Sequence, residues 1–313
     1  MGLANIEDIA RAGQLASALE VCGYPKPGNV HRTADFGETT FEQFIASSVA
    51  IGPVLLDVAK NGFEAGKGRI KAANIEIGMA IKSAIENTMK WQRDGNTNLG
   101  VVLLLVPITA AAGATLAKEG KIEIKKLREN LSNILKSTTS DDALNVYDAI
   151  LAANMEGLGG VEKLDVRKSG SKKRIKKERI SLHEIMKISS GWDNISKEWV
   201  TDMQITFEFG YPLVKKLYRV TKNMNATTVQ IFLEILSKYP DTFVQRIHGK
   251  KVAEKVSEQA AAIVKKGGML TSRGRVLVAE FDKELRDKNI NPGTTADLTA
   301  SSLMLAILDG VRP

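Results

Sequence analysis

A loop near the start of the chain carries side chains that could handle a phosphorylated ligand. Two prolines and a glycine exclude a regular helix from residues 24–32, and proline fixes its own φ, so the segment should be stiff. It would present Lys26, His31 and Arg32 in a fixed arrangement, while Gly28 lets the backbone approach a ligand. An ordinary connector between two helices explains the local pattern equally well.

A second candidate lies where residues 95–100 lead into a long uncharged segment. A helix that begins there would point backbone N–H groups and the positive end of its dipole at an anion. Asn96, Thr97 and Asn98 add neutral donors, and the loop ends at Gly100. An ordinary helix cap is the alternative.

Three carboxylates and an arginine complete the candidates. Asp35 follows the proline loop, Asp241 and Arg246 surround a turn, and Asp297 begins the last apolar segment. Carboxylates suit Mg²⁺ and a guanidinium suits phosphate. The plain alternatives are an Asx-turn at Asp35, a surface ion pair between Asp241 and Arg246, and a capping box that joins Thr294 to Asp297.

Several enzyme classes lack their motifs in this chain. The three histidines have no zinc-binding spacing, and there is no Gly-x-Ser-x-Gly, Walker loop or dinucleotide fingerprint. These absences argue against a hydrolase triad, a P-loop kinase and a Rossmann dehydrogenase.

The composition predicts an all-α fold. Of 313 residues 43% are apolar and only 5% aromatic, helix formers dominate, and few segments alternate with period two. We expect residues 1–313 to form a single domain of roughly a dozen helices, with a cleft between inter-helix loops. The uncharged segment 99–117, interrupted by Pro107 and Gly113, reads as a central buried helix rather than a membrane span.

The charge indicates an anionic partner. A net charge of +8 suits a nucleotide, a CoA-like molecule, nucleic acid or a membrane surface. The most basic run, residues 163–179, has no aromatic residue for base stacking, so we expect a flexible loop rather than a nucleic-acid surface; closure over a polyphosphate is a third option. The lone Cys22 and the absence of a signal-peptide pattern favour a cytoplasmic protein without membrane attachment.

Four segments together resemble the triphosphoribosyl-dephospho-CoA synthase family. They occur in the family's order and span nearly the whole chain. They are the Lys-Pro-Gly-x-Val-x-Arg pattern from Lys26 to Arg32, the loop Gly95–Gly100, Asp241-Thr242 with Arg246 and Gly249, and Asn291–Leu298.

The resemblance implies a transferase with ATP as donor and a ribose hydroxyl of 3′-dephospho-CoA as acceptor, which releases adenine and uses Mg²⁺. A homodimer is compatible with it. It suggests the following roles: Lys26, Arg32 and Arg246 bind phosphates; Asn96, Thr97 and Asn98 hold phosphate or ribose; Gly28 and Gly100 belong to the substrate site; Asp35 and Asp241 hold Mg²⁺. Asp297 is the base or a second metal ligand, and Asp35 and His31 also serve the chemistry.

The chain departs from the family pattern at several positions. Asn98-Leu99 stand where a His-Lys pair is common, Thr33–Phe36 replaces a His-x-Asp-Met element, and Phe243 replaces an asparagine. His31 stands where the family often has aspartate. These departures leave open a related enzyme with another acceptor. A non-catalytic RNA-binding protein that uses residues 163–179 is the alternative from a different class.

Overall fold

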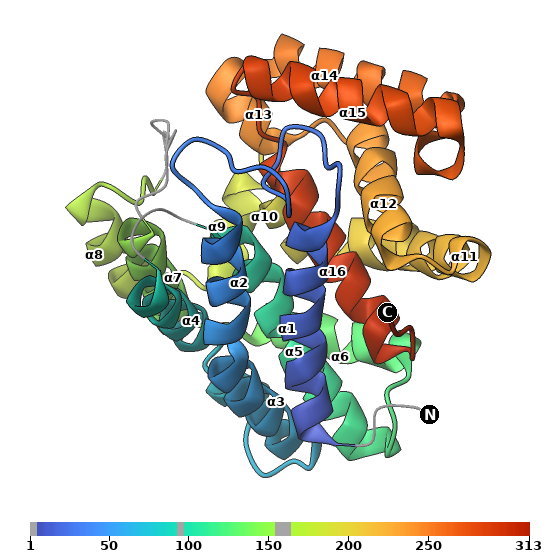
Figure 1. Ribbon diagram of the computed structural model, residues 1–313. Helices are drawn as coiled ribbons and strands as arrows, with labels where there is room; N and C mark the ends of the chain where they lie inside the picture. Colours follow the sequence, from blue (N-terminus) through green and yellow to red (C-terminus); the bar gives the residue numbers. More distant parts are fainter. Residues whose placement is uncertain (1–4, 93–96, 154–163) are drawn as a thin grey trace.

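The computed structural model describes residues 5–92, 97–153 and 164–313 (Figure 1). Within these ranges the chain forms sixteen α-helices, two short 3₁₀ segments and one π-helical segment, and its only β-structure is a pair of isolated bridges. The predicted all-α class is confirmed. Short helices such as α10 and α13, with seven residues each, account for the larger number of helices.

In chain order the elements are α1 Ile6–Cys22, α2 Phe41–Ala50, α3 Gly52–Gly66, η1 Ala72–Ile75, α4 Ile77–Trp91, α5 Leu99–Glu119, α6 Ile124–Ser137, α7 Ser140–Ala152, α8 Ser169–Glu178, α9 Leu182–Ser189, α10 Asn194–Val200, η2 Ile205–Gly210, α11 Tyr211–Thr221, α12 Met224–Lys238, α13 Thr242–His248, α14 Lys250–Lys265, η3 Gly268–Leu270, α15 Ser272–Asp287 and α16 Gly293–Leu308.

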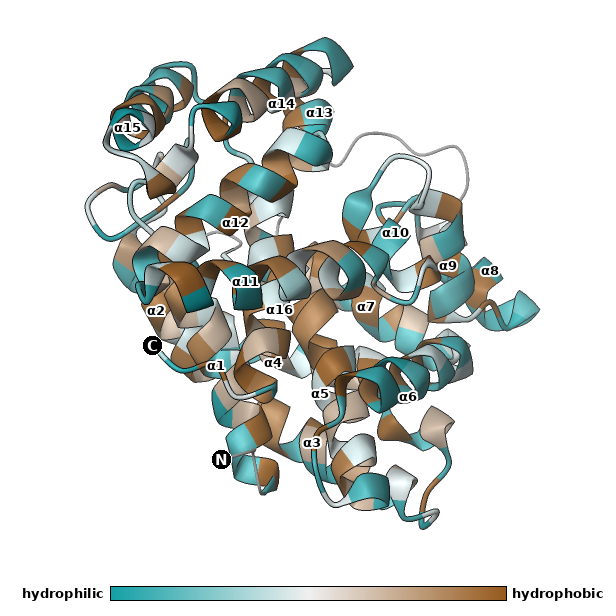
Figure 2. Ribbon diagram, turned by 90° about the vertical axis from the view of Figure 1, so that its right-hand side faces the viewer, coloured by the Kyte–Doolittle hydropathy of each residue, from teal (hydrophilic) through white to brown (hydrophobic). Residues whose placement is uncertain are grey.

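Helix α5 is the centre of the main core. In its most apolar stretch 94% of the residues are buried, and Figure 2 shows the helix surrounded by other helices. Residues 41–66 also pass a length-and-hydropathy test for a membrane span, but they form two helices that meet at Ile51. The prediction of a central buried helix at 99–117 is confirmed, because a helix apolar on all sides is stable when protein surrounds it.

A second, smaller hydrophobic cluster joins α12 to the helical layer of α13, α14 and α15. Helices α12 and α16 contribute to both clusters: Ile231 and Leu298 face the main core, whereas Phe232 and Ala296 face the smaller one. The first turn of α16 therefore lies where the two parts meet, as the red helix in Figure 1 shows.

The basic run does not form the loop that the sequence suggested. Helix α8 occupies Ser169–Glu178, and Lys172 reaches Asp148 of α7 with an Nζ–Oδ1 distance of 2.5 Å. The first basic residue, Lys163, lies outside the described residues. Lysine and arginine are good helix formers, so a run of them is compatible with a solvated helix as well as with a loop.

Candidate active site

A cavity of about 310 Å³ lies where all four sequence segments meet. The proline loop contributes Asn29, the start of α5 contributes residues 97–101, α13 contributes Arg246, and the start of α16 contributes Asp297. Segments that are far apart in the chain thus meet at one cavity, as the sequence predicted.

The residues that line the cavity include an apolar group and a polar group. The apolar side comes from α7, α9 and the segment before α10, with Val146, Ile150, Ile185, Met186 and Trp192 among its residues. The polar side holds three carboxylates, those of Glu20, Asp193 and Asp297. This division suits a ligand with one polar, charged part and one apolar part.

Asp297 lies against the first turn of α5. A Cβ built on Gly100 would stand 2.0 Å from Asp297 Oδ2, so only glycine lets the carboxylate come this close. The backbone N–H of Val101 donates a hydrogen bond to Asp297. The helix terminus that was expected to bind phosphate therefore already holds a carboxylate of the protein.

The capping alternative for Asp297 is wrong. Helix α16 begins at Gly293 after Pro292, without a side-chain cap, and Asp297 lies one turn inside the helix. Burial is the main reason that the pKa of Asp297 stands well above its usual range, and the nearby carboxylates of Glu20, Asp241 and Asp193 raise it further. A raised pKa makes this carboxylate a stronger proton acceptor than an ordinary aspartate.

Lys26 does not line the cavity as a phosphate-binding cation. Its side chain is fully buried, and its ammonium forms an ion pair with Glu20 and a 3.0 Å hydrogen bond to the Glu20 carbonyl. Burial lowers the pKa of Lys26 and raises that of Glu20, and the attraction between the two charges reduces both shifts without cancelling them. The residue that faces the cavity is Glu20, at the end of α1.

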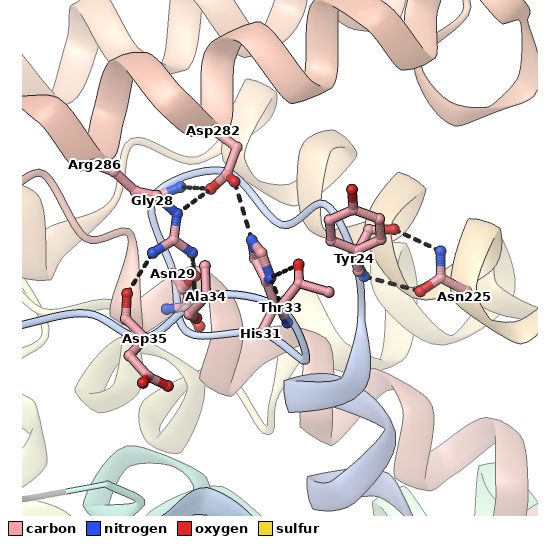
Figure 3. A network of polar contacts seen from close by, with 10 residues as sticks. All are labelled: Tyr24, Gly28, Asn29, His31, Thr33, Ala34, Asp35, Asn225, Asp282 and Arg286. Atoms are coloured by element: carbon pink, nitrogen blue, oxygen red, sulfur yellow. Dashed lines mark hydrogen bonds and ion pairs between the residues drawn. The ribbon is translucent and has the colours of Figure 1, made fainter. Parts of the chain in front are cut away.

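Three other candidates in the proline loop bond to other parts of the protein and do not line the cavity; Figure 3 shows two of them, Gly28 and His31. His31 is buried, with Nε2 3.0 Å from Asp282 Oδ2, and the Gly28 N–H donates to Asp282 Oδ1 at 3.0 Å. Arg32 donates to the Cys22 carbonyl at 2.7 Å.

The two aspartates expected to bind Mg²⁺ are structural as well. Asp35 is exposed, lies outside the cavity lining and accepts the Phe41 N–H at the start of α2. Asp241 is buried, and its two oxygens accept four hydrogen bonds, two from backbone groups of α13 and two from Thr295. A carboxylate satisfied in this way caps a helix and has little capacity left for a metal ion.

The structure describes only the end of the loop before α5. Asn96 lies outside the described residues, whereas Thr97 and Asn98 line the cavity. Thr97 Oγ1 lies 2.6 Å from Ser47 Oγ, and Asn98 Nδ2 donates to Thr88 Oγ1 at 3.0 Å. These bonds fix both side chains at the polar wall.

Among the described residues that line the cavity, Arg246 is the only basic one. It is exposed, and its guanidinium lies 5.0 Å from the centre of the Phe243 ring. Within the described ranges it has no acidic partner, so its charge is available to an anionic ligand.

The comparison with known families agrees with this arrangement. The family model described as ATP:dephospho-CoA triphosphoribosyl transferase matches residues 6–312. The chain belongs to this family.

Two relatives from this triphosphoribosyl transferase family are distant but match over more than nine-tenths of their length. The chain is 22% identical to the 2-(5''-triphosphoribosyl)-3'-dephosphocoenzyme-A synthase of Klebsiella pneumoniae, over 96% of this chain and 91% of that protein. It is 24% identical to the probable enzyme of the same name from Streptococcus equi subsp. equi, over 97% of both. A crystal structure from Archaeoglobus fulgidus, assigned to triphosphoribosyl-dephospho-CoA synthase, superposes with a TM-score of 0.65 at 29% identity and covers 87% of this chain and all of that one.

Sequence reasoning about this transferase missed Glu20, Asn29 and Asp193. A signal for Glu20 exists in the sequence, because it follows Ile9 and Ala16 on the apolar stripe of α1, where a charged residue is unusual. Asp193 caps α10 by accepting the Ser196 N–H at 2.8 Å, and nothing in its local sequence distinguishes that role from a place in a cavity.

Proposed function

We propose that this chain transfers the 5-triphosphoribosyl group of ATP to a ribose hydroxyl of 3′-dephospho-CoA, with the cavity as the site of the reaction. Membership of the transferase family supports the activity. The observation that supports the location is the convergence of all four family segments on one cavity wall. The cavity also combines an unpaired cation, carboxylates and an apolar wall, which a nucleotide and a CoA-like molecule both require.

The reaction exchanges one bond at the anomeric carbon of ATP. The bond from C1′ to adenine N9 breaks, a bond from C1′ to the acceptor oxygen forms, and the acceptor hydroxyl loses its proton while adenine gains one. We assign Asp297 as the group that takes the hydroxyl proton, because its carboxylate faces the cavity and is fixed by Gly100 and Val101. Arg246, which is exposed and lines the cavity, binds the triphosphate.

Mg²⁺ would enter with ATP. Among the described residues no three His, Cys, Asp or Glu side chains form a metal-binding group. Mg²⁺ bound to a nucleotide needs only one or two protein carboxylates, because phosphate oxygens and water supply the other ligands. Asp193 fits this requirement, since Ser196 bonds only its Oδ2 and the residue lines the cavity. The ion would neutralise the triphosphate.

The direct test is to incubate the protein with ATP, Mg²⁺ and 3′-dephospho-CoA and to quantify adenine and the coupled product by chromatography and mass spectrometry. We expect equal amounts of both, formed only when donor and acceptor are present together. If adenine is released only with a different acceptor, the acceptor assignment is wrong. If no ribosyl acceptor leads to adenine release, the proposal is refuted.

Replacing Arg246 by alanine should weaken the use of ATP. The substitution removes the unpaired cation of the cavity wall, and losing one preorganised charge typically reduces kcat/KM by about 10²–10³-fold. Steady-state kinetics with ATP as the varied substrate measures the effect. Arg273→Ala, which removes an exposed cation on α15 away from the cavity, is the matched control and should leave kcat/KM unchanged.

A cytoplasmic location and a homodimer stay predictions from the sequence.

A further inference from the structure

Two asparagine side chains form a pair at the polar wall of the cavity. Asn29 Nδ2 donates to Asn291 Oδ1 at 2.8 Å, and both residues line the cavity. Asn29 is only 4% exposed, and its Oδ1 has no hydrogen-bond partner among the described residues. A buried acceptor without a partner is costly, so a ligand donor at this position would be favourable.

Hydrogen bonds to the backbone of both asparagines fix the pair. Arg286 Nη2 donates to the Asn29 carbonyl at 2.7 Å, and its Nε donates to Asp282 Oδ1 at 3.0 Å (Figure 3). On the other side, the Gly293 N–H donates to the Asn291 carbonyl at 2.9 Å. The backbone of both asparagines is therefore fixed before any ligand arrives, which reduces the entropy lost on binding.

The pair offers one acceptor and one donor. The acceptor is Asn29 Oδ1, and the donor is Asn291 Nδ2, for which the described residues provide no acceptor. If O and N are exchanged in both amides, the pair still offers one acceptor and one donor, but Asn291 then supplies the acceptor and Asn29 the donor. Phosphate oxygens and metal ions each satisfy only half of this pattern, because phosphates only accept and metal ions bind only oxygens.

An aromatic ring lies beside the pair. A Cβ built on Gly293 would stand 3.4 Å from Phe243 Cδ1 and 3.9 Å from Asn291 Oδ1, so the ring and the amide flank the same point. Phe243 also lines the cavity and lies next to the guanidinium of Arg246. Aromatic rings bind the faces of nucleobases, and asparagine amides bind the edge of adenine through its amino group and a ring nitrogen.

We propose that Asn29, Asn291 and Phe243 bind the adenine of ATP, Asn29 and Asn291 along its edge and Phe243 on its face. This inference rests on the proposed function and names the end of the cavity that takes the leaving base. The adenine amino group donates to the amide oxygen, and an adenine ring nitrogen accepts from the amide N–H. At the edge formed by N6 and N7 of adenine, guanine presents two acceptors, O6 and N7, so one of them would face the amide oxygen in either arrangement of the two amides.

The same contacts favour departure of the base. As the C1′–N9 bond breaks, the electron pair moves onto adenine, and an N–H donor at a ring nitrogen binds the base more strongly in that state than in ATP. Asn29 and Asn291 would thus contribute to specificity and also to the rate.

The test compares Asn29→Ala and Asn291→Asp with the unaltered protein. The second variant keeps the size of the side chain and removes the donor. We expect each to lose about 5- to 150-fold in adenine affinity, measured by calorimetry, and a similar factor in the preference for ATP over GTP. Asn225→Ala is the matched control, because Asn225 anchors the same loop by bonding Tyr24 and Arg32 outside the cavity lining. It should change neither value.

Adenine titration does not require turnover, so the two proposals can fail separately. If the unaltered protein binds adenine and both variants keep its affinity and the ATP preference within twofold, the assignment is overturned. Loss in the Asn225 variant equal to that in the Asn29 variant would likewise overturn it, since loosening of the loop would then explain the effect. If the unaltered protein binds adenine but forms no product, only the proposed function fails.

Discussion

Asp297→Asn is expected to reduce the rate of adenine release by about 10²–10⁴-fold, the usual scale for losing a general base. The substitution keeps the shape of the side chain and its contact with Gly100, and it removes the ability to accept a proton.

The same substitution should make the folded protein more stable at neutral pH. Because the pKa of Asp297 is raised in the folded state, chiefly by burial, the folded protein binds this proton more tightly than the unfolded chain does. Stability is therefore lost as the pH rises from the usual aspartate range through the raised value. An asparagine carries no charge at any pH and avoids this loss.

Thermal unfolding at several pH values, run beside the activity assay, measures both effects. We expect a higher Tm than that of the unaltered protein at pH 7, with the difference shrinking at acidic pH. A variant that unfolds at a lower temperature at pH 7 would show that the carboxylate supports the fold, and a fully active one would remove Asp297 from the mechanism.

Lys26→Met should destabilise the fold by about 3–5 kcal/mol, because it leaves the buried carboxylate of Glu20 without its cation. Methionine matches the length of the lysine stem, so the effect reports the lost charge more than lost packing. Denaturant unfolding followed by circular dichroism measures it. A phosphate-binding role for Lys26 predicts instead an almost unchanged stability and a raised KM for ATP.

The double variant Lys26→Met/Glu20→Gln is the control for this argument. It removes both charges together, so it should recover most of the stability that Lys26→Met loses. If the double variant is less stable than Lys26→Met alone, the ion pair does not explain the effect. Its activity would in addition show whether the Glu20 carboxylate, which faces the cavity, takes part in the reaction.

The sequence identified the segments of the site better than the atoms that face it. The apolar run that became α5 follows from local pattern, and the four segments do meet, although α16 begins at Gly293, two residues before the expected start. Within the proline loop, however, the charged side chain of Lys26 turns into the protein, while the neutral Asn29 lines the cavity. Proline and glycine predict a stiff loop, but the direction of each side chain depends on partners elsewhere in the chain.

Those partners explain the other corrections. His31 and Gly28 both bond Asp282, about 250 residues away in sequence, and Asp241 caps α13 while it bonds Thr295 of α16. A carboxylate that caps a helix and one that binds a metal look alike in a single sequence, because both roles need the same oxygens.

The most direct test of the central claim is a crystal structure of the protein with ATP and Mg²⁺ in the absence of acceptor. The account predicts that the base lies against Phe243 and Asn291, that the triphosphate reaches Arg246, and that the anomeric carbon faces Asp297. A nucleotide bound at the proline loop beside Arg32, with the cavity empty, would contradict it.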